Sequence, residues 1–138
     1  MTEVLRMRYL LDTNICIYAI NQRSDAVVER LKHEGKANLT TSTIVAAELA
    51  FGVEKSSRSE TKQLLQLFLS GLHVLPWGES AIWHYARQRK LLRQAGTPIG
   101  EMDLLIASQA LGDDLTLVTN NTREFERIEG LKLENWVA

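Results

Sequence analysis

Short apolar runs alternate along the chain with longer stretches in which apolar residues recur every three or four positions. The short runs are typical of buried strands, and they occupy residues 9–11, 39–41, 73–75, 115–119 and 131–133. The longer stretches predict helices at residues 15–20, 24–35, 42–52, 57–71, 79–95, 101–112 and 121–127. Strands that alternate with helices favour a parallel sheet with helices on both faces. We therefore expect an α/β fold with a short parallel sheet of four to five strands.

Polar residues and glycines mark where several of these helices should begin and end. The third helix should begin at Ser42 or Thr43 and stop near Gly52. The fourth begins with Ser57 followed by Glu60, a spacing typical of a capping box. These signals predict helix boundaries from local hydrogen bonding alone.

The apolar stripes of the helices predict which side chains face the core. In the long helix we expect Ile82 and Trp83 on or near the packed side. For Phe51, Leu65 and Phe68 in the two preceding helices we also favour the core, because apolar stripes usually face inward. The alternative for these three residues is a surface that binds another protein chain.

Composition and charge fit one ordinary globular domain. The 138 residues carry 45% hydrophobic and 24% charged residues, and we expect a single domain over residues 1–138 with 1–6 as a short tail. The net charge of −1 neither indicates nor excludes a nucleic-acid partner. Cys16 is the only cysteine, which excludes an internal disulfide and suits a reducing cytoplasm. No apolar run approaches the roughly 20 residues that cross a membrane, so no membrane association is expected.

Carboxylates and amides recur where an apolar strand stops or a helix begins. Asp12 follows the first strand, Glu48 lies in an otherwise apolar helix, and Asp103 lies in the first turn of another. Residues 119–121, Thr-Asn-Asn, follow the clearest strand. In parallel sheets ligands bind at the carboxyl ends of the strands, so these groups could share one crevice. Oxygen ligands of this kind suit Mg²⁺ and a phosphodiester-cleaving site.

Each of these acids also has a purely structural explanation. Asp12 could bond the backbone of the turn that follows it, Glu48 could lie on a solvated helix edge, and Asp103 could stabilise the positive end of its helix. Asn121 and Glu124 fit a helix N-cap and its third helical residue. The metal hypothesis depends on the set of acids, because several such coincidences in one chain are improbable.

The ordered set of motifs resembles PIN-domain proteins, and more narrowly the bacterial toxin ribonucleases of the VapC type. The segments that carry the resemblance are 10–14 (LLDTN), 48–52 (ELAFG), 100–103 (GEMD) and 117–121 (LVTNN), with Phe125 after the last. They span nearly the whole chain in order. The fold implied is a PIN-like α/β domain, and the activity implied is metal-dependent RNA cleavage, controlled by an antitoxin.

The resemblance also implies roles for particular residues. Asp12, Glu48 and Asp103 would be the catalytic acids and the metal ligands, with Glu48 acting directly or through water. Many relatives carry an aspartate at the fourth position, but this chain offers Thr119, Asn120 and Asn121, then Glu124. Glu124 is the candidate fourth acid, and the supporting residues are Thr13, Asn14, Thr119 and Asn121. The implied cofactor is Mg²⁺, with Mn²⁺ as a substitute.

The implied substrate is structured RNA, in particular transfer RNA cut in the anticodon region, with initiator transfer RNA as the preferred candidate. The resemblance also implies a cognate antitoxin and a homodimer as partners. The long helix carries Arg87, Arg89, Lys90 and Arg93 without an intervening acid, which could track a phosphate backbone. The alternative for these four residues is an ordinary solvated helix face.

Two other functional classes fit parts of the sequence. A phospho-accepting receiver or phosphatase would use Asp12, but it needs an adjacent acidic pair or a late lysine that the motifs lack. A catalytically inactive PIN-like module that binds RNA or protein would explain the missing fourth aspartate. The presence of Asp12, Glu48 and Asp103 favours the nuclease over that module.

Overall fold

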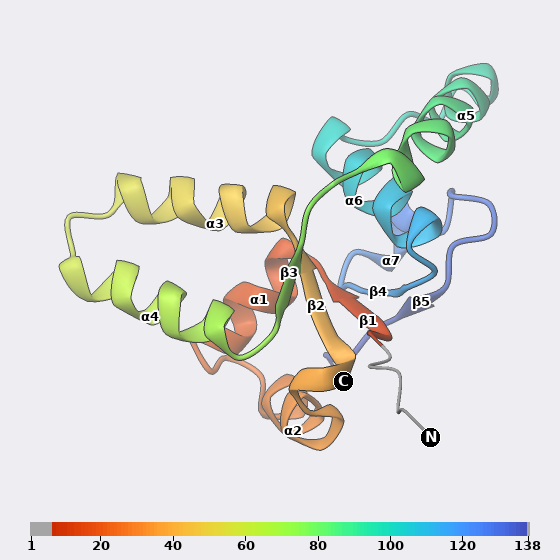
Figure 1. The fold of residues 1–138 in the computed structure, drawn as a ribbon. Helices are drawn as coiled ribbons and strands as arrows, with labels where there is room; N and C mark the ends of the chain where they lie inside the picture. The colour runs from red at the N-terminus through yellow and green to blue at the C-terminus, as the bar shows by residue number, and fades with distance from the viewer. Residues whose placement is uncertain (1–6, 138) are drawn as a thin grey trace.

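One sheet of five parallel strands forms the centre of the molecule. The computed structural model describes residues 7–137. Its strands are β1 (Tyr9–Leu11), β2 (Leu39–Ser42), β3 (His73–Leu75), β4 (Thr116–Val118) and β5 (Leu133–Glu134), in the order β3-β2-β1-β4-β5 (Figure 1). All neighbouring pairs are parallel. The predicted α/β fold with a parallel sheet is confirmed. The tail predicted at residues 1–6 lies outside the described residues.

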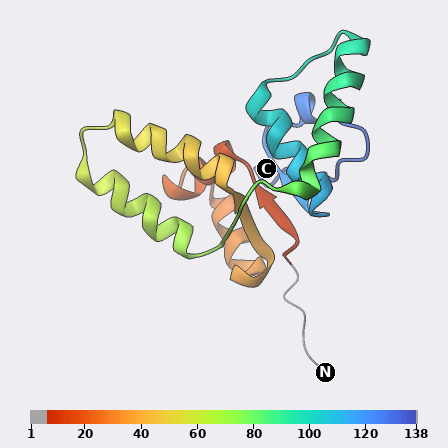
Figure 2. The same ribbon diagram turned by 45° about the horizontal axis from the view of Figure 1, so that its top comes forward.

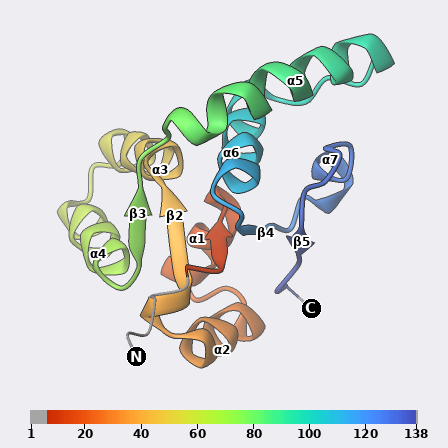
Figure 3. The same ribbon diagram turned by 45° about the vertical axis from the view of Figure 1, so that its right-hand side comes forward.

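Helices cover the sheet from two sides. They are α1 (Thr13–Ile20), α2 (Asp25–Glu34), α3 (Thr43–Lys55), α4 (Ser59–Ser70), α5 (Glu79–Ala95), α6 (Glu101–Gly112) and α7 (Thr122–Phe125). Helices α3 and α4 form a hairpin that projects from one side, and α5 packs against α6 on the other (Figures 2 and 3). None of the helices within residues 7–137 is long and apolar enough to cross a membrane.

The central strand β1 places the site. It pairs with β2 on one side and β4 on the other. Strands β2 and β3 extend the sheet from β1 in one direction, and β4 and β5 extend it in the opposite direction. Leu10 and Leu11 are fully buried, since helices cover both faces of this strand. In open α/β sheets, ligands bind in the crevice beyond the carboxyl ends of the strands, at the point where the strand order reverses. Asp12 and Thr119 follow β1 and β4 directly at this crevice.

Several predicted boundaries were wrong by a few residues. Helix α3 continues through Gly52 to Lys55, because a helix tolerates one glycine at an exposed position. The capping box predicted at Ser57 and Glu60 is absent: Arg58 is the N-cap of α4, and no side chain caps that helix end. Strand β4 is shorter than predicted, β5 begins two residues late, and α7 ends at Phe125.

Three large apolar side chains that we predicted to be packed are exposed instead. Trp83 is 80% exposed, Phe51 64% and Ile82 45%. The buried face of α5 carries few residues, among them Ala81 and Leu92, and it packs against α6. Ile82 and Trp83 lie outside this face. The predicted burial was correct for Leu65, and Phe68 packs partly against the core.

The contact between α5 and α6 depends on Gly112. A Cβ atom at this position would lie 2.4 Å from the carbonyl oxygen of Ser80 and 2.6 Å from its carbonyl carbon. Because the obstructing atoms are backbone, the helices would have to move apart. We expect Gly112→Ala to lower the free energy of unfolding by about 1–3 kcal/mol in urea denaturation. Gly52→Ala is the matched control: with nothing within 4 Å of its Cβ, it should stabilise α3 by roughly 0.5–1 kcal/mol. Equal stability of Gly112→Ala and the wild type would contradict this account of the contact.

Candidate active site

Asp12 connects β1, α1 and β4 through its carboxylate. Its Oδ1 accepts the backbone N–H of Ile15 at 2.9 Å, so it is the N-cap of α1. Its Oδ2 accepts the hydroxyl of Thr119. Burial raises the pKa of the Asp12 carboxyl, and these hydrogen bonds offset part of that rise. The turn-bonding role and a metal-binding role are therefore compatible in one side chain.

Thr119 links the end of β4 to Asp12. It is fully buried, and besides donating to Asp12 its hydroxyl oxygen accepts the backbone N–H of Asn121 at 2.9 Å. The sequence identified Thr119 only as a supporting residue of the fourth motif. Its direct bond to Asp12 depends on β1 and β4 being neighbours, and the only sequence signal for it was the position of both residues at strand ends.

Glu48 reaches the crevice from α3. Its Oε1 accepts the hydroxyl of Thr13 at 2.9 Å, and its side chain is only partly exposed. The charge of Glu48 contributes to the raised pKa of Asp12, so the two carboxylates are near each other. Asn14, which follows Thr13 in the first turn of α1 and was also predicted as a supporting residue, is exposed.

Asp103 has the most perturbed carboxyl group of the set. It lies half-buried in the first turn of α6, and its pKa is raised from 3.8 to about 6, mainly by burial. Three neighbouring carboxylates, those of Glu124, Asp12 and Glu48, raise it further in that order. The fold therefore brings together all four acids that the sequence suggested. A carboxyl of this kind binds a proton more readily than an ordinary aspartate, and a cation beside it would lower its pKa again.

Glu124 joins the group from α7. Its Oε1 accepts the backbone N–H of Gly100 at 3.1 Å, and its Oε2 accepts the side-chain amide of Asn121 at 2.7 Å. Asn121 occupies the N-cap position of α7, but its side chain does not cap the helix. The predicted capping interaction is thus replaced by one between the two side chains. This arrangement holds Glu124 beside the turn that leads into Asp103.

A substitution at Glu124 separates an electrostatic role from a structural one. Glu124→Gln keeps the size of the side chain and removes its charge. We expect the RNA cleavage that the sequence resemblance implies to fall at least about tenfold, because the charge of the candidate fourth acid is lost. The free energy of unfolding should change by less than about 1.5 kcal/mol, the value of one net hydrogen bond. A variant that loses stability but retains activity per folded molecule would show that Glu124 only stabilises the turn at Gly100.

The carboxylate cluster has no protein cation to balance it. Within residues 7–137, none of the four acids takes part in an ion pair. In the same part of the chain, no group of three or more His, Cys, Asp or Glu side chains is placed to hold a metal ion directly. Mg²⁺ usually binds one or two carboxylates and completes its shell with water and phosphate oxygens. A partly buried acidic cluster without a counter-ion is a suitable environment for Mg²⁺. Asp12 and Asp103 are the candidates for its direct ligands.

Of the four predicted basic residues of α5, one contacts other side chains and three are exposed. Arg89 contacts the hydroxyl of Tyr85 and lies 3.5 Å from Glu101 in the first turn of α6. Arg87, Lys90 and Arg93 are exposed. The contact with Glu101 places the middle of α5 beside the start of α6, two residues before Asp103.

Comparison with known proteins gives consistent matches over the chain. The PIN domain family model matches residues 9–131. Ribonuclease VapC2 of Rickettsia felis is 47% identical, covering 94% of this chain and 98% of that protein. The tRNA(fMet)-specific endonuclease VapC of Shigella flexneri is 39% identical, with coverage of 94% and 98%.

Solved structures agree with the sequence relatives. The crystal structure of VapBC2 from Rickettsia felis, bound to a DNA fragment from its promoter, superposes with a TM-score of 0.88 at 45% identity and covers 94% of this chain and 99% of that one. The DNA-bound VapBC of Salmonella typhimurium gives a TM-score of 0.89 at 37% identity, with coverage of 94% and 98%.

Proposed function

The chain belongs to the PIN-domain family and, within it, to the VapC ribonucleases, and from this premise we propose that it is a magnesium-dependent endoribonuclease toxin that cleaves transfer RNA. The observation that supports the proposal most strongly is the convergence of four carboxylates at the carboxyl ends of β1 and β4. Burial, and after it the charges of Glu124, Asp12 and Glu48, raises the pKa of Asp103 to about 6. Such a cluster is costly to maintain unless a cation binds it.

The roles of the acids follow from their surroundings. Asp12 is held on both oxygens by Ile15 and Thr119, so it presents a fixed, buried negative charge. Asp103 is half-buried and would hold the ion together with Asp12. A bound Mg²⁺ would polarise the scissile phosphate and lower the pKa of an attacking water. Glu48 and Glu124, each anchored by neutral donors, would orient that water and accept its proton.

The proposed substrate is transfer RNA, cut in the anticodon region, with initiator transfer RNA as the preferred target. Two relatives, 39% and 37% identical, are named tRNA(fMet)-specific endonucleases. The exposed cations Arg87, Lys90 and Arg93 lie on the helix that borders the acidic cluster, where they would contact RNA phosphates. Single-stranded loops are the parts of an RNA that a protein can read by base, which suits an anticodon.

Incubation of the purified, antitoxin-free protein with total transfer RNA tests the proposal. Cleavage should occur with Mg²⁺ and with Mn²⁺, and it should stop with EDTA. Sequencing of the fragment ends then identifies the RNA and the cleaved bond. Cleavage that continues in EDTA would overturn the metal dependence, and absence of cleavage with either metal would favour an inactive RNA- or protein-binding module.

We further propose that an antitoxin binds the groove beside Glu48. The matched crystal structures are toxin–antitoxin complexes. A groove of about 190 Å³ between α1, α3 and α4 is mostly apolar, with Thr13 and Glu48 among its lining residues. An apolar groove with an acid in its wall would accept an apolar peptide segment carrying a basic residue. Occupation of the groove would place the inhibitor beside the acidic cluster.

Gly52 offers a direct test of this groove. It lines the groove one turn after Glu48, and a side chain there meets nothing within 4 Å. Gly52→Arg would fill the groove and place a cation next to Glu48, without a steric cost to the fold. We expect binding of the cognate antitoxin, measured by titration calorimetry, to weaken at least about tenfold, as for loss of a central interface contact. Leu67→Arg, at an exposed position of α4 outside the groove, should bind normally; equal affinity of both variants would contradict the groove assignment.

We also propose a homodimer. Ile82 and Trp83 are adjacent, large and exposed on α5, a combination that favours contact with another chain. Sedimentation equilibrium of the antitoxin-free protein tests this, and a monomer at all concentrations would contradict it.

A further inference from the structure

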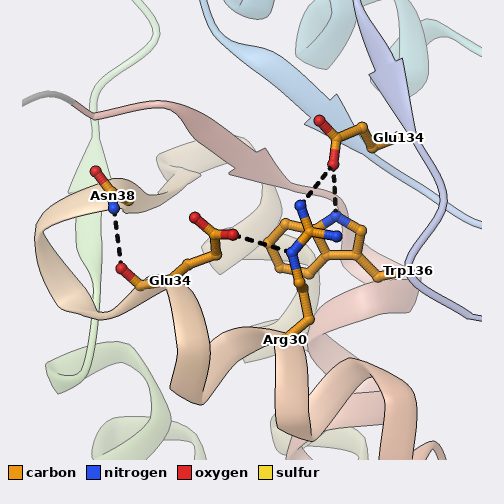
Figure 4. A network of polar contacts seen from close by, with 5 residues as sticks. All are labelled: Arg30, Glu34, Asn38, Glu134 and Trp136. Atoms are coloured by element: carbon orange, nitrogen blue, oxygen red, sulfur yellow. Dashed lines mark hydrogen bonds and ion pairs between the residues drawn. The ribbon is translucent and has the colours of Figure 1, made fainter.

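Residues 133–137 contact α2 through polar and aromatic side chains (Figure 4). We call the cluster formed by Arg30, Glu134 and Trp136 the C-terminal clamp. Arg30 pairs with Glu34 at 3.0 Å on its own helix and with Glu134 at 3.1 Å. Its guanidinium carbon lies 4.8 Å from the centre of the Trp136 ring, and the indole N–H of Trp136 donates to Glu134 at 3.0 Å. Arg30 also lies over the ring of Tyr9, at 5.9 Å, so it is held by two carboxylates and two aromatic rings.

The same segment supports the loop between β4 and α7. The backbone N–H of Thr119 donates to the carbonyl of Glu134 at 3.0 Å, and the amide of Asn135 donates to Asn120 at 3.3 Å. Thr119 in turn donates its hydroxyl to Asp12. A continuous series of contacts thus leads from Arg30 on α2, through Glu134 and Thr119, to the Asp12 carboxylate.

Strand β5 needs such an anchor because it is very short. It consists of two residues at the edge of the sheet and pairs with only two residues of β4, Leu117 and Val118. The backbone N–H groups of Leu117 and Thr119 also donate to the carbonyls of Lys132 and Glu134. Edge strands with so few hydrogen bonds open readily unless side chains hold them. The family model matches residues 9–131, so β5 and Trp136 lie beyond the matched region.

We propose that the C-terminal clamp positions Thr119, and through it the Asp12 carboxylate, for catalysis. Arg30, Glu134 and Trp136 are positioning residues that do not touch the RNA or the metal. Their catalytic consequence depends on the proposed nuclease function, whereas their effect on the loop does not. The alternative is a local attachment of the chain end that leaves Asp12 unaffected.

Arg30→Met separates the two possibilities. Methionine keeps an apolar stem against Trp136, whose own contact with Tyr9, with ring centres 5.0 Å apart, is left in place. The variant loses both ion pairs and the two cation–π contacts, with Trp136 and with Tyr9. Lys132→Met is the matched control, since it removes an exposed ion pair with Asp114 next to β5 and leaves the clamp intact.

Native-state hydrogen exchange gives a readout that does not require activity. In Arg30→Met we expect the amides of Thr119 and Ile15 to exchange about five- to tenfold faster, the combined effect of an exposed ion pair and a cation–π contact. Ile15 is decisive, because its N–H is bonded to Asp12, far from the substitution in the chain. With transfer RNA, kcat should fall by a similar factor with little change in KM, and Lys132→Met should match the wild type in both measurements.

The outcomes distinguish the clamp from the nuclease proposal. Faster exchange at Thr119 with unchanged exchange at Ile15 and unchanged kcat would overturn the positioning role. Faster exchange at both amides in a protein that cleaves no RNA would retain the clamp and overturn the nuclease function instead. Should Arg30→Met fail to fold, Glu134→Gln removes the ion pair alone and is judged by the same two amides.

Discussion

Asp103→Asn should abolish RNA cleavage and at the same time stabilise the metal-free protein at neutral pH. Asp103 is half-buried among the carboxylates of Glu124, Asp12 and Glu48, which raise its pKa. In the proposed site Asp103 would hold the Mg²⁺ ion together with Asp12, so the loss of its charge should weaken metal binding. We expect kcat to fall by at least about a hundredfold, as for loss of one preorganised electrostatic group in other enzymes. Asp12→Asn should lose activity similarly, because it changes the most buried acid of the cluster.

The control for this prediction is another aspartate at the start of a helix. Asp25 lies exposed in the first turn of α2, and Asp25→Asn should leave cleavage unchanged. Steady-state kinetics on transfer RNA, with circular dichroism to verify folding, checks all three variants. Full activity of a folded Asp103→Asn protein would remove Asp103 from the catalytic group.

The free energy of unfolding of the metal-free protein should fall as the pH rises from about 4 to about 6, and Mg²⁺ should reverse the fall. The folded-state pKa of Asp103, about 6, exceeds its ordinary value of 3.8, so the folded state binds this proton more tightly than the unfolded state. The contribution of Asp103 is then most favourable below pH 3.8 and is lost as the pH rises through 6. Because the side chain is half-exposed, solvent reduces the effect to on the order of 1 kcal/mol.

Urea unfolding at pH 4.5 and pH 7.5, with and without Mg²⁺, measures this coupling. Subtraction of the Asp103→Asn curve isolates the contribution of one carboxyl from all other titrating groups. At pH 7.5, Mg²⁺ at a hundred times its dissociation constant should stabilise the wild type by about 2.7 kcal/mol and the variant by much less. A metal-free wild type whose stability rises relative to the variant between these pH values would show that the acids do not repel one another.

Local patterns predicted most of the elements because they depend on short-range physics. The strand at residues 9–11 and the helices at 79–95 and 101–112 have the bounds that the apolar spacing indicated. Errors occurred where a local signal competed with packing. Gly52 did not end α3, since the helix continues at no steric cost at that exposed position. Trp83 was predicted to be packed because it is apolar. It is exposed instead, because the buried face of α5 is the one that carries Ala81 and Leu92.

The sequence by itself determined which acids could form a site. Asp12 followed a strand, Asp103 and Glu124 lay in the first turns of helices, Glu48 stood in an otherwise apolar helix, and their order along the chain is that of a PIN domain. Only the tertiary structure decided how they meet. The order of the strands makes Thr119 a hydrogen-bond donor to Asp12, and the turn before α6 gives Glu124 its partner in Gly100. Apolar periodicity specifies that a face is covered but not by which element. Hydrogen bonds and charge–charge repulsion between residues as far apart as 12 and 119 therefore exist only after strands and helices have packed.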